Sequence, residues 1–191
     1  MSDLTITTAG VSETPVSGAS KNNGTIIRVF PVLDNGTAYT ANDVMWDSIE
    51  IPNIVRTKGG VSKITAFYMY NHFDGADPDI DLVFTQKQAN LGTLNDVVGS
   101  GSLWTEALVK EAKLISTVHF DTGNNNSIDL INGKSYGGAL ATTTIWSPLA
   151  NFLVQAEQDS TSIYFAGVDR SGGLDYGADD LEFVFHIEYL S

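Results

Sequence analysis

The sequence predicts an all-β fold, namely an antiparallel β-sandwich of jelly-roll type with one short helix and an extended N-terminal arm. Three observations predict it. Apolar residues recur at every second position after residue 24, the alternating runs are rich in Val, Ile, Thr, Phe and Tyr, and turns containing Gly or Asn separate the runs. Short strands divided by such turns are typical of sandwiches and not of alternating strand–helix units.

Residues 1–24 are the first element and differ in composition from the rest of the chain. They are rich in Ser, Thr, Gly and Asn and contain few bulky apolar residues. We expect an extended arm that becomes ordered where a partner or a neighbouring subunit holds it, or else a terminus without a role. Residues 25–191 then form one sandwich domain, because a chain of 191 residues buries roughly 70% of its unfolded surface.

The alternating runs predict the strands in chain order. They are Thr25–Leu33, Trp46–Ile51, Val61–His72, Asp79–Thr85, Leu114–Phe120, Leu140–Trp146, Ser162–Val168 and Asp180–Leu190. The last run shows the pattern most clearly. One face carries Leu181, Phe183, Phe185, Ile187 and Tyr189, and the other carries Asp180, Glu182, His186 and Glu188, with Val184 as the exception. We therefore expect Phe185 to be fully inside the sandwich.

Turns and one helix complete the predicted architecture. Gly and Asn supply the positive φ of tight turns at Asp34-Asn35-Gly36, Lys58-Gly59-Gly60, Asp74-Gly75, Asp121-Thr122-Gly123, Asn132-Gly133 and Ser171-Gly172-Gly173. After Ser102, the segment LWTEALVKEAKL places apolar residues at helical spacing. We predict a short helix there, packed against the sandwich and capped by Ser102.

Composition and charge exclude several classes of protein. The chain has no cysteine, which excludes disulfide scaffolds, cysteine-based metal sites and thiol nucleophiles. Its 23 acidic and 10 basic residues give a net charge of −13, which argues against binding to nucleic acid or to anionic membranes. We find neither a basic and apolar leader nor a run of about 20 apolar residues that could span a membrane. We therefore expect a protein that stays in the cytoplasm or is packaged there into a larger particle.

The histidines provide no clear catalytic site. His72, His119 and His186 are far apart in the sequence, and a hydrolase would have to combine His186 with Glu188 and a distant serine. There is no G-x-S-x-G motif, and Gly99–Ser102 lacks the strand–turn–helix context that a nucleophile needs. Nucleotide-binding and zincin motifs are also absent. We expect no enzymatic activity and no cofactor.

Two acidic clusters are candidates for calcium sites. They comprise Asp74, Asp77, Asp79 and Asp81, and Asp121, Asn124, Asn126 and Asp129. Neither fits the EF-hand pattern, and Pro78 interrupts the first. Turn formation explains these residues better than a metal site.

The densest basic group is Arg56, Lys58 and Lys63. The aromatic residues near it, Phe67, Tyr68, Tyr70 and Phe73, fall on both faces of a strand, which argues against a stacking platform.

The order of several segments resembles a family of small virion structural proteins from tailed bacteriophages. The segments are IEIPNIVRTK at Ile49–Lys58, DPDIDLVFTQ at Asp77–Gln86, KLISTVHFD at Lys113–Asp121 and SIYFAGVDRSGGLDYGADDLEFVFHIEYL at Ser162–Leu190. The opening MSDLTITTAGV is similar to the start of several phage head decoration proteins. The chain departs from the family in the insert between Phe84 and Lys113 and in the loop Asn124–Asn126.

The resemblance implies a capsid decoration (cement) protein, located in the virion and assembled in the host cytoplasm. Its partners would be the major capsid protein or other virion subunits and further copies of itself, and it would have no catalytic, metal or cofactor residues. Two alternatives stay open. A head–tail connector or tail component would share this composition. A receptor- or glycan-binding fibre module would use exposed aromatic residues, for which the candidates are Trp104, Tyr136, Trp146 and Tyr176.

Overall fold

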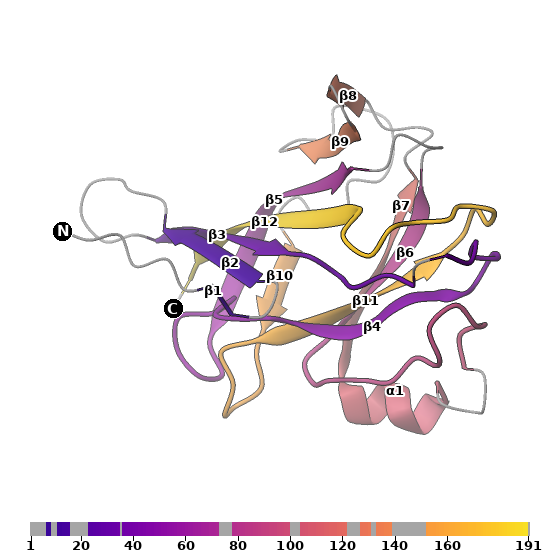
Figure 1. Ribbon diagram of the computed structural model, residues 1–191. Coiled ribbons are helices and arrows are strands. Elements are labelled where there is room, and N and C mark those ends of the chain that lie inside the picture. The colour runs from indigo at the N-terminus through magenta and orange to yellow at the C-terminus, as the bar shows by residue number, and fades with distance from the viewer. Residues whose placement is uncertain are drawn as a thin grey trace.

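The computed structural model confirms the predicted all-β sandwich. It describes residues 7–8, 11–15, 23–34, 36–72, 78–99, 104–121, 127–130, 133–138 and 152–190. Two antiparallel sheets pack face to face, and one short helix lies at the side of the smaller sheet (Figure 1).

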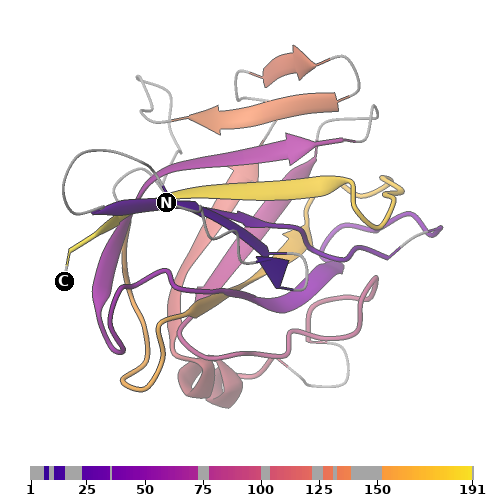
Figure 2. The same ribbon diagram turned by 60° about the vertical axis from the view of Figure 1, so that its left-hand side comes forward.

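The larger sheet contains eight strands. In spatial order these are β1 (Thr7–Thr8), β2 (Val11–Pro15), β3 (Gly24–Val29), β12 (Leu181–Tyr189), β5 (Val61–Asn71), β9 (Gly133–Gly138) and β8 (Ser127–Leu130), and β10 (Phe152–Gln155) pairs with the first part of β5. Figure 2 shows β3, β12, β5 and β9 following one another across this sheet.

The smaller sheet has four strands, in the order β4 (Val44–Ile51), β11 (Ile163–Asp169), β6 (Asp79–Thr85) and β7 (Leu114–Asp121). The chain passes from one sheet to the other between β3 and β4, β4 and β5, β5 and β6, β7 and β8, β10 and β11, and β11 and β12. A jelly roll requires such repeated crossing, but the finer jelly-roll assignment stays a prediction.

Most of the predicted strands are confirmed to within two residues at each end. Exceptions are the run Thr25–Leu33, whose strand β3 ends at Val29, and the run Leu140–Trp146, which lies outside the described residues. Sequence alternation missed β8, β9 and β10. It also missed the two short strands within residues 1–24, where β2 pairs with β3.

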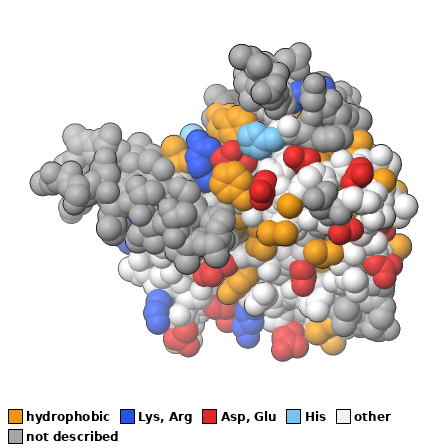
Figure 3. Space-filling model, in the orientation of Figure 1, with side chains coloured by type: hydrophobic (Ala, Val, Ile, Leu, Met, Phe, Trp, Pro, Cys, Tyr) orange, Lys and Arg blue, Asp and Glu red, His pale blue; other side chains and the backbone are white. Residues whose placement is uncertain are grey.

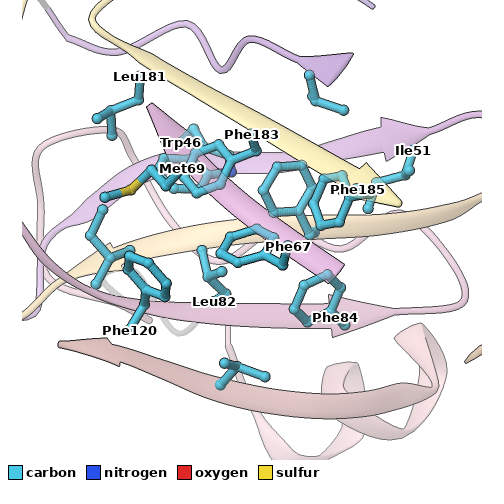
Figure 4. Close-up of a cluster of buried hydrophobic side chains, with 14 of the residues drawn as sticks. Trp46, Ile51, Phe67, Met69, Leu82, Phe84, Phe120, Leu181, Phe183 and Phe185 are labelled. Carbon is cyan, nitrogen blue, oxygen red and sulfur yellow. The ribbon is translucent and has the colours of Figure 1, made fainter. Parts of the chain in front are cut away.

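The core lies between the facing sheets and is rich in aromatic side chains (Figure 4). The ring of Phe185 lies 5.3 Å from Phe67 and 5.5 Å from Phe165, measured between centroids. The predicted inner face of β12 is confirmed, because Leu181, Phe183, Phe185 and Ile187 are buried. The outer face departs from simple alternation: Glu182 and Val184 are buried there too.

Gly167 makes room for the largest side chain of the core. It pairs with Trp46 on one side and with Leu82 on the other. A Cβ atom at this position would lie closer than 3.0 Å to three atoms of the Trp46 indole. The buried Trp46 ring also packs against Phe165 and Phe183, with centroids 5.7 and 5.1 Å away. Position 167 therefore needs a residue without a side chain.

The predicted short helix is confirmed as α1 (Glu106–Ala112), but its predicted N-cap is wrong. Thr105 occupies the N-cap position in an extended conformation, and its side chain accepts a hydrogen bond from the Leu108 amide at 3.4 Å. The chain enters the helix late because Trp104, one residue earlier, packs against a second apolar cluster. That cluster lies on the outer side of the smaller sheet and consists of Val44, Val83, Leu91, Ala166 and Val168.

Candidate functional site

His119 lies in a polar cluster on the outer face of the smaller sheet. Its Nδ1 atom is 2.8 Å from Asp81 Oδ1, and its Nε2 atom is 3.3 Å from Asp79 Oδ1. The Arg170 Nε atom lies 3.5 Å from Asp81 Oδ2, and the Arg170 guanidinium donates to Asn42. Each carboxylate thus faces a nitrogen of His119. This set of contacts ties β6, β7 and the end of β11 together.

The structure brings the two predicted acidic clusters to the same edge, since Asp79 pairs with Asp121 in register. Four of their residues, Asp74, Asp77, Asn124 and Asn126, lie outside the described residues, and Asp121 and Asp129 are described by their backbone alone. Among the residues that the structure describes, no group of three His, Asp or Glu side chains is arranged to hold a metal ion.

The other two histidines lie on the outer face of the larger sheet. His72 Nε2 is 3.4 Å from Glu182 Oε2, and the other oxygen of Glu182 accepts from Arg28. The His186 ring lies 5.3 Å from Tyr68, and burial, together with the charge of Arg28, lowers the pKa of His186.

The combination of His186, Glu188 and a serine that a hydrolase would need does not form among these residues. Glu188 lies 3.6 Å from Lys63 Nζ, and the side chains of the three histidines contact carboxylates and a tyrosine ring rather than a serine hydroxyl. The described histidines therefore make cross-strand contacts on the sheet surfaces.

Two buried carboxylates stabilise the loops at one end of the sandwich. Asp43 accepts from the backbone amide and hydroxyl of Thr40 at 2.7 and 2.8 Å. Asp169 accepts from the Gly172 amide at 2.5 Å, while burial raises its pKa. Tyr39 lies in the same region, where burial raises its pKa to about 12. These groups are used in loop structure, with the carboxylate oxygens directed at backbone donors.

Two of the aromatic residues considered for glycan stacking are in the wrong place for it. Tyr136 and Tyr176 are both buried, so neither presents a ring face to a ligand. Trp104 is half-buried against the second apolar cluster, and Trp146 lies outside the described residues. Since stacking needs an accessible ring face, the expectation for Tyr136 and Tyr176 is wrong.

Arg56 and Lys58, from the densest basic group of the sequence, lie at one end of the sandwich, which we call the basic end. This end comprises residues 53–60, 86–87, 113–114, 153–161 and 189–190. Hydrogen bonds join these segments: the Gly59 amide donates to the Ser160 carbonyl at 3.0 Å, and the Gln86 side-chain amide donates to the Gln155 carbonyl at 3.0 Å. The cations at this end are Arg56, Lys58, Lys87 and Lys113, and the acidic residues are Glu157 and Asp159.

Three exposed leucines accompany these cations. Leu114, Leu153 and Leu190 expose 41, 59 and 51% of their surface. Leu153 pairs with Lys63 in the sheet, and the Leu190 amide donates to the Val61 carbonyl at 3.2 Å, so both flank the start of β5. The neighbouring Val154 is buried, which directs Leu153 outward because successive strand side chains alternate between faces.

The opposite end, which we call the acidic end, comprises residues 30–43, 94–98 and 169–180. The Tyr39 amide donates to the Leu174 carbonyl, and the Asn95 side chain donates to Asp34, each at 3.0 Å. The described acids here are Asp34, Asp43, Asp96, Asp169, Asp175, Asp179 and Asp180, and the described base is Arg170. Figure 3 shows acidic side chains over the right-hand part of the molecule, and Lys or Arg together with further acidic side chains at the lower left.

Charge is therefore distributed unevenly between the two ends, whereas exposed apolar residues occur at both: Leu114, Leu153 and Leu190 at the basic end, and Val32, Leu94 and Val97 at the acidic end. Part of this charge distribution is visible in the sequence as Arg56 and Lys58, but the fold is what brings these two residues together with Lys87, Lys113 and the leucines. No family model, curated protein or solved structure matches this chain. Among the described residues, no helix has the length and apolar character needed to cross a membrane.

Proposed function

We propose that this chain is a non-enzymatic structural protein of a virus particle, which decorates or cements a capsid by docking its basic end onto coat subunits. The observation that carries the proposal is the combination of exposed Leu114, Leu153 and Leu190 with the cations of the basic end; the exposed apolar residues of the acidic end, Val32, Leu94 and Val97, lie among carboxylates instead. Apolar side chains surrounded by charged and polar residues are the usual composition of a protein–protein contact. Its partners are coat subunits and neighbouring copies of the same chain.

The energetics of such a contact fit the exposed surface. Burying one leucine against a partner contributes about 1.5–3 kcal/mol. A contact of standard size covers roughly 800 Å² per partner, a small share of the 10114 Å² accessible surface of this chain. Many weak contacts repeated over a particle then add up through multivalency. A rigid aromatic core supports this use, because the contact surface is then held in one shape.

Leucine variants at the basic end test the proposal, with a matched variant at the acidic end. Leu153→Glu and Leu190→Glu place a charge in the proposed contact, whereas Val97→Glu changes a residue of equal exposure, 51% like Leu190, at the opposite end. Occupancy on assembled particles is measured by sedimentation and quantitative gel analysis. We expect roughly a tenfold loss of affinity or more for the leucine variants and wild-type occupancy for Val97→Glu.

Equal occupancy of all three variants would contradict the docking surface. Unfolding of the free variants provides the control for folding, since exposed substitutions change stability by less than about 0.5 kcal/mol. A closed ring of copies in solution, without binding to coats, would favour a head–tail connector instead. Binding to a glycan array would favour a receptor-binding module.

A further inference from the structure

The edge of β3 is a strand-acceptor site that the N-terminal segment occupies. Backbone pairing joins β2 to β3 over five residue pairs, from Val11 with Val29 to Pro15 with Thr25. The other side of β3 pairs with β12. If β2 left, β3 would expose unpaired amides and carbonyls at the edge of the sheet, where another strand could bind.

The connection between β2 and β3 is longer than hairpin pairing requires. Two residues are enough to join antiparallel strands, whereas here residues 16–23 lie between Pro15 and Gly24. The segment reads VSGASKNN. Fully extended, it spans roughly 26 Å, so the same connection allows β2 to reach the β3 edge of an adjacent molecule.

We propose that copies of this chain exchange their N-terminal strands when they are crowded, so that β2 of one copy pairs with β3 of its neighbour. Each copy has one donor strand and one acceptor edge, and exchange within a closed set of copies therefore leaves no β3 edge unpaired. The pairing between copies uses the same residue pairs as the pairing within one chain. The balance then depends on the concentration of neighbours relative to that of the chain's own arm.

The position of the linker makes the exchange compatible with docking. The Asn23 carbonyl accepts from the Tyr189 amide at 2.6 Å, so the linker reaches the sandwich next to the basic end. The inference rests on the proposed function in this one respect: attachment to a coat is what holds neighbouring copies close together. A short covalent connection gives the chain's own β2 an effective concentration in the millimolar range, and closely packed neighbours compete at that level.

Engineered cysteines test the exchange directly, because the natural chain has none. Thr14 pairs with Ile26, and Glu13 pairs with Ile27. The variants Thr14→Cys and Ile26→Cys are prepared separately with different tags, mixed at concentrations from micromolar to about millimolar, and oxidised. A disulfide between them forms above the level of random collision only when the arm of one copy pairs with the edge of another. Glu13→Cys mixed with Ile26→Cys is the control with its register shifted by one residue.

We expect the yield of covalent heterodimer to increase with protein concentration and to reach roughly five times the yield of the control. The double variant Thr14→Cys/Ile26→Cys, oxidised in dilute solution, should instead close within one chain. Heterodimer at the control level at every concentration would overturn the exchange. Failure of the double variant to close would overturn the acceptor edge itself. Both readouts use free protein, so loss of coat binding in the leucine variants would leave them unchanged.

Discussion

Replacing Gly167 by alanine tests the packing of the core at its tightest position. The added methyl group would overlap three atoms of the Trp46 benzene ring, all closer than 3.0 Å to the new Cβ. Neither partner can move freely. Gly167 is paired with strands on both sides, and Trp46 is enclosed by Phe165 and Phe183. We therefore expect a cost of about 3 kcal/mol, at the upper end of the range for overpacked cores.

A second variant separates this clash from other effects of the substitution. Trp46→Phe removes ring atoms that the new methyl group would meet, at a cost of its own of about 1–3 kcal/mol for the lost packing. In that background Gly167→Ala should cost less than in the natural chain, by about 1–2 kcal/mol, because contacting residues couple.

Urea denaturation of the four proteins, with equal m-values, measures the coupling. If Gly167→Ala costs less than about 1 kcal/mol, or costs the same with Phe at position 46, the clash is not what makes glycine necessary there.

Three further predictions concern the core, the outer face and the arm. Phe185→Ala should cost about 3–5 kcal/mol in urea, since the side chain is fully buried; a loss below about 1 kcal/mol would place the ring outside the core. Burial, and after it the charge of Arg28, lowers the pKa of His186 below its ordinary value of 6.5. The contribution of this side chain to stability is therefore fully present above about pH 6.5 and is lost as the pH falls through the folded pKa. His186→Phe should reduce that fall between about pH 7.5 and 5, and an unchanged slope would contradict this cause. Deleting residues 1–22 should leave a cooperative thermal transition but weaken attachment to particles; unchanged occupancy would show that the arm has no role there.

Strands with strong alternation could be predicted because their signal is local. β6 was predicted with the bounds that the structure shows, Asp79–Thr85, since apolar and polar residues alternate along it. β10 was missed because it has four residues, too few for a periodic pattern. β2 was missed for another reason: its sequence, VSETP, has little strand preference, and its structure depends on the β3 edge beside it.

The helix cap and the polar cluster show where local reasoning ends. Ser102 and Thr105 are both good N-cap residues, and the packing of Trp104, which the sequence does not reveal, favours the later one. Alternation places Asp79 and Asp81 on one face of β6. That His119 lies opposite Asp81 depends on the register between β6 and β7, which is a property of the sheet and not of either strand.

The uneven charge explains how a chain with a net charge of −13 can keep a surface for contact with another protein. β12 runs between the two ends and has nine residues, so the ends are about 30 Å apart at the usual rise per residue. The Debye length at physiological salt is about 8 Å, so the field of the acidic end is screened over that distance. A partner at the basic end therefore meets the local charges of Arg56, Lys58 and Glu157 and the leucines beside them. It does not meet the net charge of the chain, so a net charge of −13 does not argue against contact between the basic end and a coat protein.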